Sequence, residues 1–474
     1  MRLRETLQGY TVARLKELVR VCGGPGPEGN RKEQLVRYLF ERLTDTGSLA
    51  ELWQDLDPLS KKAVAAAYHG GGTFNEEAFA AQYGEVPGRR GADVLHDFGG
   101  GIQVVYGYRR ESQPLDLFIH GNRLPRELVE LLAPFVPPPE KFRPKGLERA
   151  PDAVEINGKK LPLWQADTEE AGLHDLAAYL RLYARDELSY SSSSDRMTAT
   201  GARTLLRNLL DGDFLPHSER VKPADTIRPS GLDHFVRRSG LAYYHRGRRK
   251  LSDGGEALLR HQDAEALLDA FETWAAESSF DELGRIKSVK GQNAQRTFLT
   301  PPAERREAII EALSWCPAGV WIPVGEFYRA LLVWEFDIEL DHGYESYLSI
   351  EDPLYGRIYY AEAEGQALIE TLYMGAVLME SLGSIGALDV LYLPPGEIGP
   401  GSKKIRYSLY DGLSYFRVNP LGAYLLGQAH EYVPSRPLDA PLFTVDPTLL
   451  LTLKDPGSLT PNLRDQLQQV SVEE

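Results

Sequence analysis

The sequence HRGRRK at residues 245–250 carries a dense group of cations. These cations are Arg246, Arg248, Arg249 and Lys250, and the cations predicted to work beside them are Arg203, Arg207, Arg237 and Arg238. Guanidinium and ammonium groups bind phosphate oxygens, and these contacts supply the sequence-independent part of a protein's affinity for DNA. The cluster therefore predicts a local phosphate-binding surface.

The charge distribution limits how large that surface can be. The chain has a net charge of −15, which argues against a protein that coats nucleic acid indiscriminately. Residues 196–260 contain 13 Lys+Arg against 7 Asp+Glu (+6), whereas residues 320–400 contain 2 against 14 (−12). This asymmetry predicts a basic working face in the middle of the chain and an acidic body behind it.

A second basic pair, Arg31 and Lys32, follows the glycine-rich string GPGPEGN. Glycine-rich loops of this kind bind nucleotide phosphates when the last glycine is followed by lysine and then Ser or Thr. Here Asn30 occupies the lysine position, so we expect no ATPase of that class. We assign Arg31 and Lys32 instead to DNA binding.

Other catalytic patterns are weak. The best candidates for nuclease carboxylates, Asp152 and Glu155 with Lys159, have poor spacing for a metal site. There is no HExxH metal motif and no GxSxG nucleophile motif. We therefore expect no enzyme activity, no cofactor and no metal, while a hydrolase with an unrecognised site stays open.

An acidic stretch, FDIELDHGYES, contains Asp337, Glu339, Asp341 and Glu345. It lacks the ligand periodicity and the glycine of a calcium-binding loop. We interpret it as a solvated acidic face, or as one that contacts a basic partner.

The elements that must position the cations are mostly helices. TVARLKELVRVCGG places Val12, Leu15, Leu18 and Val19 at helical spacing, with glycines at its end. GNRKEQLVRYLFERL begins a second helix at Asn30, with Glu33 in the capping-box position. The two helices resemble a SAP module, a helix–extended–helix DNA-binding fold. An ordinary helical hairpin acting as a lid is the alternative.

The pattern along the chain predicts an α+β, mainly helical fold with a SAP-like helical module followed by several winged-helix domains. The predicted parts are 1–45, the SAP-like module; 46–112, winged-helix-like; 113–167, a strand–helix segment and Pro-rich linker; 168–262, a winged helix with a basic wing; 263–430, a helical or winged-helix domain with an acidic surface; and 431–474, a C-terminal segment. The stretch TDTGSL looks like a polar joint, so we expect residues 1–45 to fold as a separate unit.

Two strings share one layout: LAYYHRGRRKLSDGGEALL and LSYFRVNPLGAYLL each read as a strand, a turn with glycine and an apolar helix. We interpret them as imperfect internal repeats. In a winged helix the second helix of the helix-turn-helix enters the major groove and the hairpin wing contacts phosphates beside it. HRGRRK would be the tip of that wing.

These repeats, together with LHDLAAYLRLYARDELSYSSSSDRMTATGARTLLRNLL and PLFTVDPTLLLTLKDP, resemble bacterial helicase-associated proteins related to the N-terminal region of XPB-type repair helicases. The resemblance covers most of the chain from residue 49 onwards. It implies tandem winged helices that work beside a helicase or nuclease in DNA repair or phage defence. In such relatives the segment resembling PLFTVDPTLLLTL begins a further α/β domain, which here is abbreviated or cut off.

The sequence also indicates where the protein works. Cys22 and Cys316 cannot form a disulfide framework, and no apolar signal or membrane-spanning stretch is present. We expect a cytoplasmic, non-catalytic accessory protein that binds double-stranded DNA and a helicase or nuclease partner, without a membrane. The alternative is a scaffold whose winged helices bind a partner protein.

Overall fold

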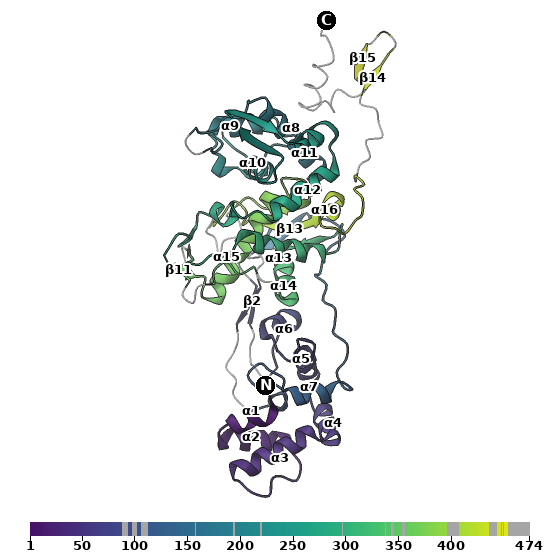
Figure 1. Ribbon diagram of the computed structural model, residues 1–474, viewed down its shortest axis with the longest axis vertical. Helices are drawn as coiled ribbons and strands as arrows, with labels where there is room; N and C mark the ends of the chain where they lie inside the picture. The colour runs from purple at the N-terminus through teal and green to yellow at the C-terminus, as the bar shows by residue number, and fades with distance from the viewer. Residues whose placement is uncertain are drawn as a thin grey trace. The chain divides into compact units, whose positions relative to one another are not determined.

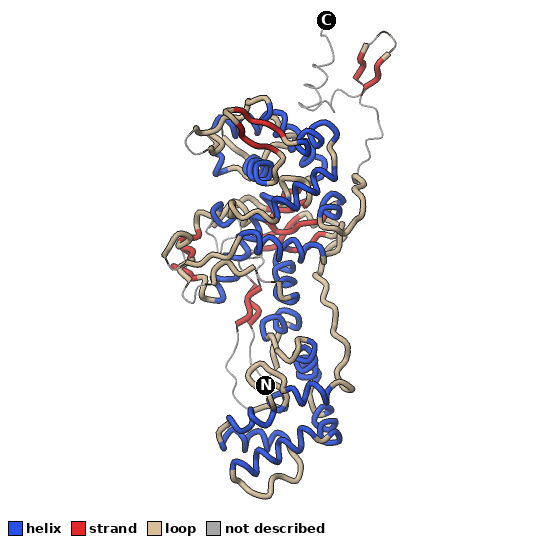
Figure 2. Tube along the Cα trace, in the orientation of Figure 1, coloured by secondary structure: helices blue, strands red, loops and turns tan. Residues whose placement is uncertain are grey.

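The computed structural model (Figure 1) describes residues 1–87, 93–96, 102–105, 112–156, 158–192, 195–218, 220–295, 297–336, 338–342, 346–352, 356–395, 407–435, 443–446, 448 and 450–453. The chain is α+β and mainly helical, which confirms the predicted class (Figure 2). It divides into two compact units: unit 1 is Met1–His96, Ile102–Arg143 and Arg329–Glu335, and unit 2 is Asp97–Gly101, Pro144–Tyr328 and Phe336–Glu474.

Among the described residues, unit 1 is built from short helices and an antiparallel pair of strands. Its elements are α1 (Leu3–Gly9), α2 (Val12–Cys22), α3 (Lys32–Thr44), α4 (Thr46–Gln54), α5 (Pro58–His69), α6 (Glu76–Tyr83), β1 (Asp93–His96), β2 (Ile102–Val105), the 3-10 helix η1 (Pro114–Leu117) and α7 (Arg126–Leu132). The short apolar segment predicted as a strand near residue 115 is η1. Residues 136–146 have no regular secondary structure, as a Pro-rich linker predicts.

The start of α3 differs from the prediction by one residue. The helix begins at Lys32, and Arg31 rather than Asn30 stands at its N-cap. The side chain of Gln34 accepts a hydrogen bond from the Arg31 amide at 3.1 Å, so Gln34 fills the role predicted for Glu33. The predicted end of α2 is confirmed, because Gly23 has a φ of 62°.

One hydrophobic core runs through the whole of unit 1, from Leu3 to Leu132, and includes the apolar faces of α2 and α3. The amide of Leu3 donates to Glu127 Oε2 at 2.9 Å, and the amide of Arg126 donates to the Met1 carbonyl. The boundary predicted after residue 45 therefore does not coincide with a gap in the packing. The polar joint TDTGSL is instead the N-cap and first turn of α4, where Asp45 accepts from the Ser48 amide.

Unit 2 combines helices with small antiparallel sheets. Its strands are β3 (Ala153–Ile156), β4 (Lys159–Pro162), β5 (Trp164–Ala166), β6 (Ala242–His245), β7 (Arg248–Leu251), β8 (Val289–Lys290), β9 (Trp321–Pro323), β10 (Ser349–Asp352), β11 (Gly356–Tyr359), β12 (Leu388–Tyr392), β13 (Leu413–Val418), β14 (Phe443–Val445) and β15 (Leu451–Leu453). Its α-helices are α8 (Glu169–Ala184), α9 (Ala199–Leu206), α10 (Arg228–Arg238), α11 (Asp253–His261), α12 (Ala264–Ala275), α13 (Pro302–Ser314), α14 (Val324–Trp334), α15 (Ala363–Gly375) and α16 (Pro420–Leu425). Shorter turns are η2 (Pro223–Asp225), η3 (Glu282–Arg285) and the π-helix η4 (Ala376–Leu382). The second half of α14 belongs to unit 1.

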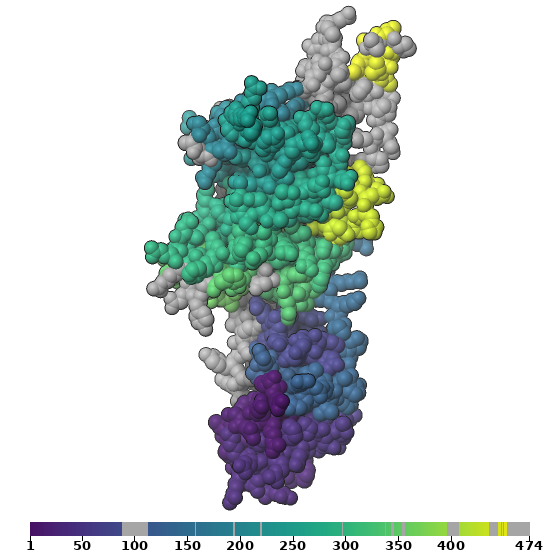
Figure 3. All heavy atoms as spheres, viewed as in Figure 1, coloured from purple at the N-terminus to yellow at the C-terminus, as the bar shows by residue number. Residues whose placement is uncertain are grey.

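The central sheet of unit 2 has the strand order β5-β12-β13-β9, and every neighbouring pair is antiparallel. Val390 lies opposite Phe416, which in turn lies opposite Ile322. Every residue of β12 is buried, and η4 packs against this strand. In the space-filling view (Figure 3) the teal and the green residues of unit 2 adjoin, as expected for one unit. Most of the predicted segment 431–474 lies outside the described residues.

The strings LAYYHRGRRKLSDGGEALL and LSYFRVNPLGAYLL look alike because each contains a capped helix with a glycine that packs against a backbone carbonyl. Ser252 caps α11, and Gly255 three residues later lies against the Leu241 carbonyl, just before β6. Asn419 caps α16, and Gly422 lies in the same way against the carbonyl of Ala387, just before β12. A side chain at either glycine would collide with backbone oxygen. The two strings therefore share a pattern because in both places a helix packs closely against the start of a strand.

Helix α10 lies inside unit 2. Its residues Arg228–Asp233, Phe235 and Val236 are buried against α8, α9, α12 and η4. At Gly231 a Cβ would collide with the carbonyl oxygen of Glu380, so the two helices touch through their backbones. Arg285 reinforces this contact with a bidentate ion pair to Glu380 at 2.7 and 2.8 Å and a hydrogen bond to the Thr226 carbonyl at 2.7 Å.

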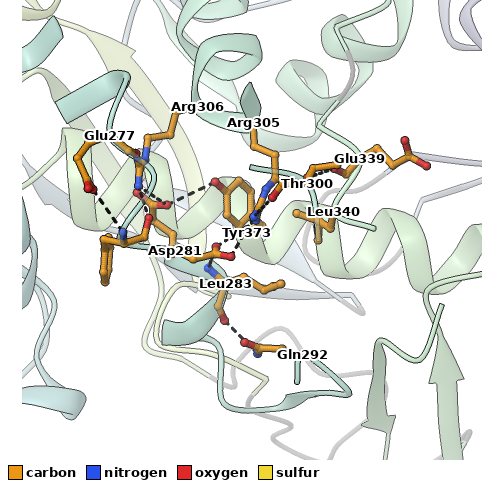
Figure 4. A network of polar contacts seen from close by, with 12 residues as sticks. Glu277, Asp281, Leu283, Gln292, Thr300, Arg305, Arg306, Glu339, Leu340 and Tyr373 are labelled. Carbon is orange, nitrogen blue, oxygen red and sulfur yellow. Dashed lines mark hydrogen bonds and ion pairs between the residues drawn. The ribbon is translucent and has the colours of Figure 1, made fainter. Parts of the chain in front are cut away.

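A second buried network ties α13 to its neighbours (Figure 4). Arg306 forms an ion pair with Glu282 at 2.7 Å and donates to the Phe280 carbonyl, while Arg305 forms an ion pair with Asp281 at 2.9 Å. Tyr373 of α15 donates to Glu282 at 3.4 Å. Removing one partner of such a network leaves an unpaired buried charge, which costs about 3–5 kcal/mol.

The first prediction concerns the contact between a helix glycine and a backbone carbonyl that occurs at Gly255 and Gly422. Replacing Gly255 with alanine should lower the free energy of unfolding by about 1–3 kcal/mol, because the new methyl group meets the Leu241 carbonyl. The adjacent Gly254 is the matched control, since the nearest atoms to its added Cβ lie at 3.8–3.9 Å. Urea unfolding of both variants is the measurement. Equal stability of the two variants would contradict the role assigned to Gly255.

The second prediction concerns the N-terminal 45 residues. Deleting residues 1–45 should expose the remaining core of unit 1, including Leu49, Trp53 and Phe118, and the truncated chain should aggregate or lose the unfolding transition of unit 1. Size-exclusion chromatography and thermal unfolding are the measurements. A truncated chain that stays monomeric with both transitions intact would restore the boundary predicted at residue 45.

Candidate nucleic-acid interface

The basic cluster forms a β-hairpin. Strand β6 pairs with β7 in antiparallel register, with Ala242 opposite Leu251 and His245 opposite Arg248. Arg246 and Gly247 form the two-residue turn, and both have positive φ, 50° and 79°. These values fit the type I′ turn that matches the twist of paired strands, and the glycine adopts it without strain.

The base of the hairpin is packed and its tip is open. Ala242 is buried, and β7 packs on α8 and α11. Every residue from 243 to 248 is exposed, and Lys250 is exposed too. An uninterrupted run of exposed residues means that the tip projects into solvent on both faces, because side chains alternate between faces along a strand.

Three of the predicted cations sit on this open tip. Arg246, Arg248 and Lys250 form no ion pair with any residue in the described parts of the chain. Arg248 and Lys250 share the hairpin face that also carries Tyr243 and His245, since pairs two residues apart along the strands lie on one face. This outward face combines two cations with two aromatic rings.

Arg249 behaves differently from its neighbours. Its guanidinium lies 4.4 Å from the ring centroid of Tyr190 and 5.8 Å from that of Tyr183. It also forms an ion pair with Asp186, and only 15% of its side chain is exposed. Arg249 is therefore packed against the body of unit 2, whereas Arg246, Arg248 and Lys250 are exposed.

The Tyr190 ring receives a second cation from α10. Arg237 lies 5.2 Å from the ring centroid and forms ion pairs with Asp195 and Asp233. The hydroxyl of Tyr190 donates to Asp233 at 2.7 Å. Arg237 and Arg249 therefore converge on one tyrosine, and both are satisfied by carboxylates.

The tyrosines of this cluster are neutral. Burial raises the pKa of the Tyr183 and Tyr190 hydroxyls, and the Asp233 carboxylate raises that of Tyr190 further. Both rings therefore remain phenols at neutral pH. The arginines meet the ring faces through cation–π attraction rather than by pairing with phenolates.

The remaining predicted cations lie elsewhere. Arg203 of α9 is partly exposed and donates a hydrogen bond to Thr200 Oγ1 at 3.1 Å. Two further cations are exposed at helix ends: Arg207 at the end of α9 and Arg238 at the end of α10. Helix α9 packs on α8 and α10. Arg31 and Lys32 are exposed at the start of α3 in unit 1.

The burial of α10 bears on how DNA could be read. In the element order helix–helix–hairpin, α10 is the helix that would enter a major groove. Its interior residues are covered by the rest of unit 2 and only its last turn carries an exposed cation, Arg238. Base readout by α10 is therefore sterically blocked in this structure.

The acidic region contributes less surface than its composition predicts. Between residues 320 and 400 the side chains of Asp341, Asp352, Glu370, Glu380 and Asp389 are buried. Asp341, predicted to be solvated, accepts hydrogen bonds from the Phe298 amide and the Ser346 hydroxyl. The expected acidic surface is corrected accordingly, because these carboxylates serve the internal polar network. Asp337 and Glu345 lie outside the described residues.

The carboxylates singled out for other classes of site lie apart from the basic hairpin. Within the described ranges, no group of three or more His, Cys, Asp or Glu side chains could hold a metal ion. Glu155 lies opposite Lys160 in the β3–β4 hairpin, and Asp152 precedes it. The helices in those ranges are all too short or too polar to cross a membrane.

Sequence reasoning located the hairpin but missed its aromatic support. Tyr183 and Tyr190 come from the segment LRLYARDELSYS, and so does Asp186, which pairs with Arg249. The pattern of this segment predicts a helix followed by a strand. The structure has an isolated bridge between Tyr190 and Met197 in place of that strand. The sequence does show Tyr183 and Tyr190 on either side of a charged turn. This spacing does not reveal that the two rings contact the β6–β7 hairpin some 60 residues later.

Comparison of the chain with protein-family models, with curated proteins and with solved structures finds no match in any of the three.

The third prediction separates the packed cation from the open ones. Replacing Arg249 with alanine should destabilise the protein by about 1–2 kcal/mol, because it removes the contacts with Tyr190 and Tyr183 and a partly screened ion pair. The same change at the adjacent Arg248 should alter stability by less than about 0.5 kcal/mol. Chemical denaturation measures both. If the two variants unfold alike, the aromatic support of Arg249 has no energetic role.

Proposed function

We propose that this chain is a non-catalytic DNA-binding accessory protein, and that the outward face and tip of the β6–β7 hairpin contact the phosphate backbone. The observation that carries the proposal is the projecting tip with Arg246, Arg248 and Lys250, none of which pairs with a described carboxylate. Cations held in the open without partners are available to phosphate oxygens. Arg203, Arg207 and Arg238 would extend the contact within unit 2, with Arg31 and Lys32 assisting from unit 1.

The proposal includes two winged helices. In residues 168–262 the order α8, α9, α10, β6, β7 supports one of them. In the later part of unit 2 the order α13, β9, α14, α15, β12, β13 supports the other, and there β9 pairs with β13 as the first strand of a winged helix pairs with the last. Most of the β12–β13 connection, where the second wing would lie, falls outside the described residues.

The expected binding mode is electrostatic rather than sequence-reading. Phosphate contacts position a protein on DNA but carry no direct sequence information, whereas base contacts require an element in a groove. Since α10 is covered by η4 and α12, we expect the hairpin to make the main contact with DNA. We therefore expect affinity for double-stranded DNA with little sequence preference and a strong dependence on salt.

The partner enzyme is part of the same proposal. The resemblance to helicase-associated proteins supports a helicase or nuclease partner in DNA repair or phage defence. The missing lysine at Asn30 supports an accessory role without ATP hydrolysis.

One observation favours a scaffold as the second candidate. The helix that a winged helix uses to read DNA here makes protein contacts through Gly231 and its neighbours. A winged helix whose reading helix packs on protein can work as a docking module, and fold alone does not decide between the two functions.

The fourth prediction tests DNA binding. Replacing Arg246, Arg248 and Lys250 together with alanine should weaken binding to a short duplex and reduce the slope of log affinity against log salt by about 3, one for each phosphate that the variant no longer neutralises. Arg249 is left in place because it supports the fold. Fluorescence anisotropy at several salt concentrations is the measurement.

The matched control replaces Lys159, Lys160 and Lys287, which are exposed cations elsewhere in unit 2. It changes the net charge equally and should alter the slope little. An unchanged isotherm for the hairpin variant at low salt, or an equal loss of affinity in the control, would remove the hairpin from the function and favour the scaffold.

A further inference from the structure

Two exposed tyrosines stand next to each other on the hairpin. Tyr243 is 46% exposed and Tyr244 is 59% exposed. Because they are adjacent in β6, their rings lie on opposite faces of the two-stranded ribbon. The hairpin therefore presents an aromatic surface on each face, close to the cationic tip.

Each ring has a cation beside it. Tyr243 lies directly opposite Lys250 in the register, and Tyr244 lies opposite Arg249, whose guanidinium is 5.7 Å from the Tyr244 ring centroid. Arg249 is paired with Asp186 and supports the fold, so the cations of this hairpin that are left to neutralise phosphates are Arg246, Arg248 and Lys250. An aromatic ring near such cations is the combination with which proteins bind single-stranded nucleic acid: the ring stacks on a base and the cations neutralise the adjacent phosphates.

The fold does not use these rings as it uses the tyrosines around them. The hydroxyls of Tyr179 and Tyr190 bond to each other and to Asp233. By contrast, the hydroxyls of Tyr243 and Tyr244 have no hydrogen-bond partner among the described residues. Two large rings left open to water at a projecting tip do little for the packing of unit 2.

We propose that Tyr243 and Tyr244 bind unpaired nucleobases by stacking, so that the hairpin prefers DNA with a single-stranded stretch to DNA that is fully paired. In a duplex the base faces are stacked on each other and unavailable, whereas an unpaired base offers its π-face. The proposal rests on the proposed function and deepens it: the cations supply affinity for any DNA backbone, and the tyrosines supply the preference for unpaired bases.

The test compares three probes with the full chain at one salt concentration: a thymidine oligonucleotide of about 16 nucleotides, an abasic oligonucleotide of the same length, and a duplex of mixed sequence. Replacing Tyr243 and Tyr244 with alanine should lower affinity for the thymidine probe by roughly tenfold or more, at about 1–3 kcal/mol per stacked base. Binding to the abasic probe and the duplex should change by less than about twofold. Phenylalanine at both positions should restore most of the affinity for thymidine, because it retains the ring.

Tyr347, a tyrosine 43% exposed elsewhere in unit 2, is the matched control, and its alanine variant should bind all three probes as the wild type does. An equal loss of affinity for the thymidine and abasic probes, or no loss for either, would overturn the stacking proposal. Failure of the proposed function looks different, because the wild-type chain would then bind none of the probes at low salt.

Discussion

The backbone contact between α10 and η4 is the constraint on which the rest of unit 2 depends. Gly231 brings α10 against the Glu380 carbonyl, and the Glu380 side chain accepts hydrogen bonds from Arg285 and Tyr410. A buried carboxylate at this depth is tolerable only when it is paired and hydrogen-bonded. The arrangement joins the helices of residues 168–262 to the central sheet, so that two predicted domains pack as one unit.

This constraint also shapes the proposed DNA-binding surface. Because α10 is packed inside unit 2, it cannot enter a groove of DNA. The surface open to a ligand is the part of residues 168–262 that does not pack. That part is the tip of the β6–β7 hairpin. Its base is anchored by Ala242 and by Arg249, which rests on Tyr190. A rigid base under an open tip fits a surface that binds an extended polyanion, because the cations are held in place before the ligand arrives.

Much of the fold follows from local sequence signals. The apolar spacing in α2 and α3, the glycines that end helices and the basic hairpin were all predictable, because each depends on residues a few positions apart. The repeated strings were recognisable because one steric requirement, a glycine against a carbonyl, recurs at Gly255 and Gly422. What failed depends on distant partners. The burial of Glu380 and Asp389 requires Arg285 and Arg417, and the continuity of the core in unit 1 requires Leu3 to meet α7. Composition and periodicity carry no information on such pairings.

We propose that the hairpin, and not α10, contacts DNA. Hydrogen exchange measured by mass spectrometry, with and without a duplex carrying a single-stranded tail, tests it directly. We expect slower exchange at residues 242–251 when DNA is bound, because the exposed tip has fast-exchanging amides that a ligand would cover. Exchange at residues 228–238 should stay unchanged, since α10 is already buried. Protection of α10 without protection of the hairpin would contradict the account.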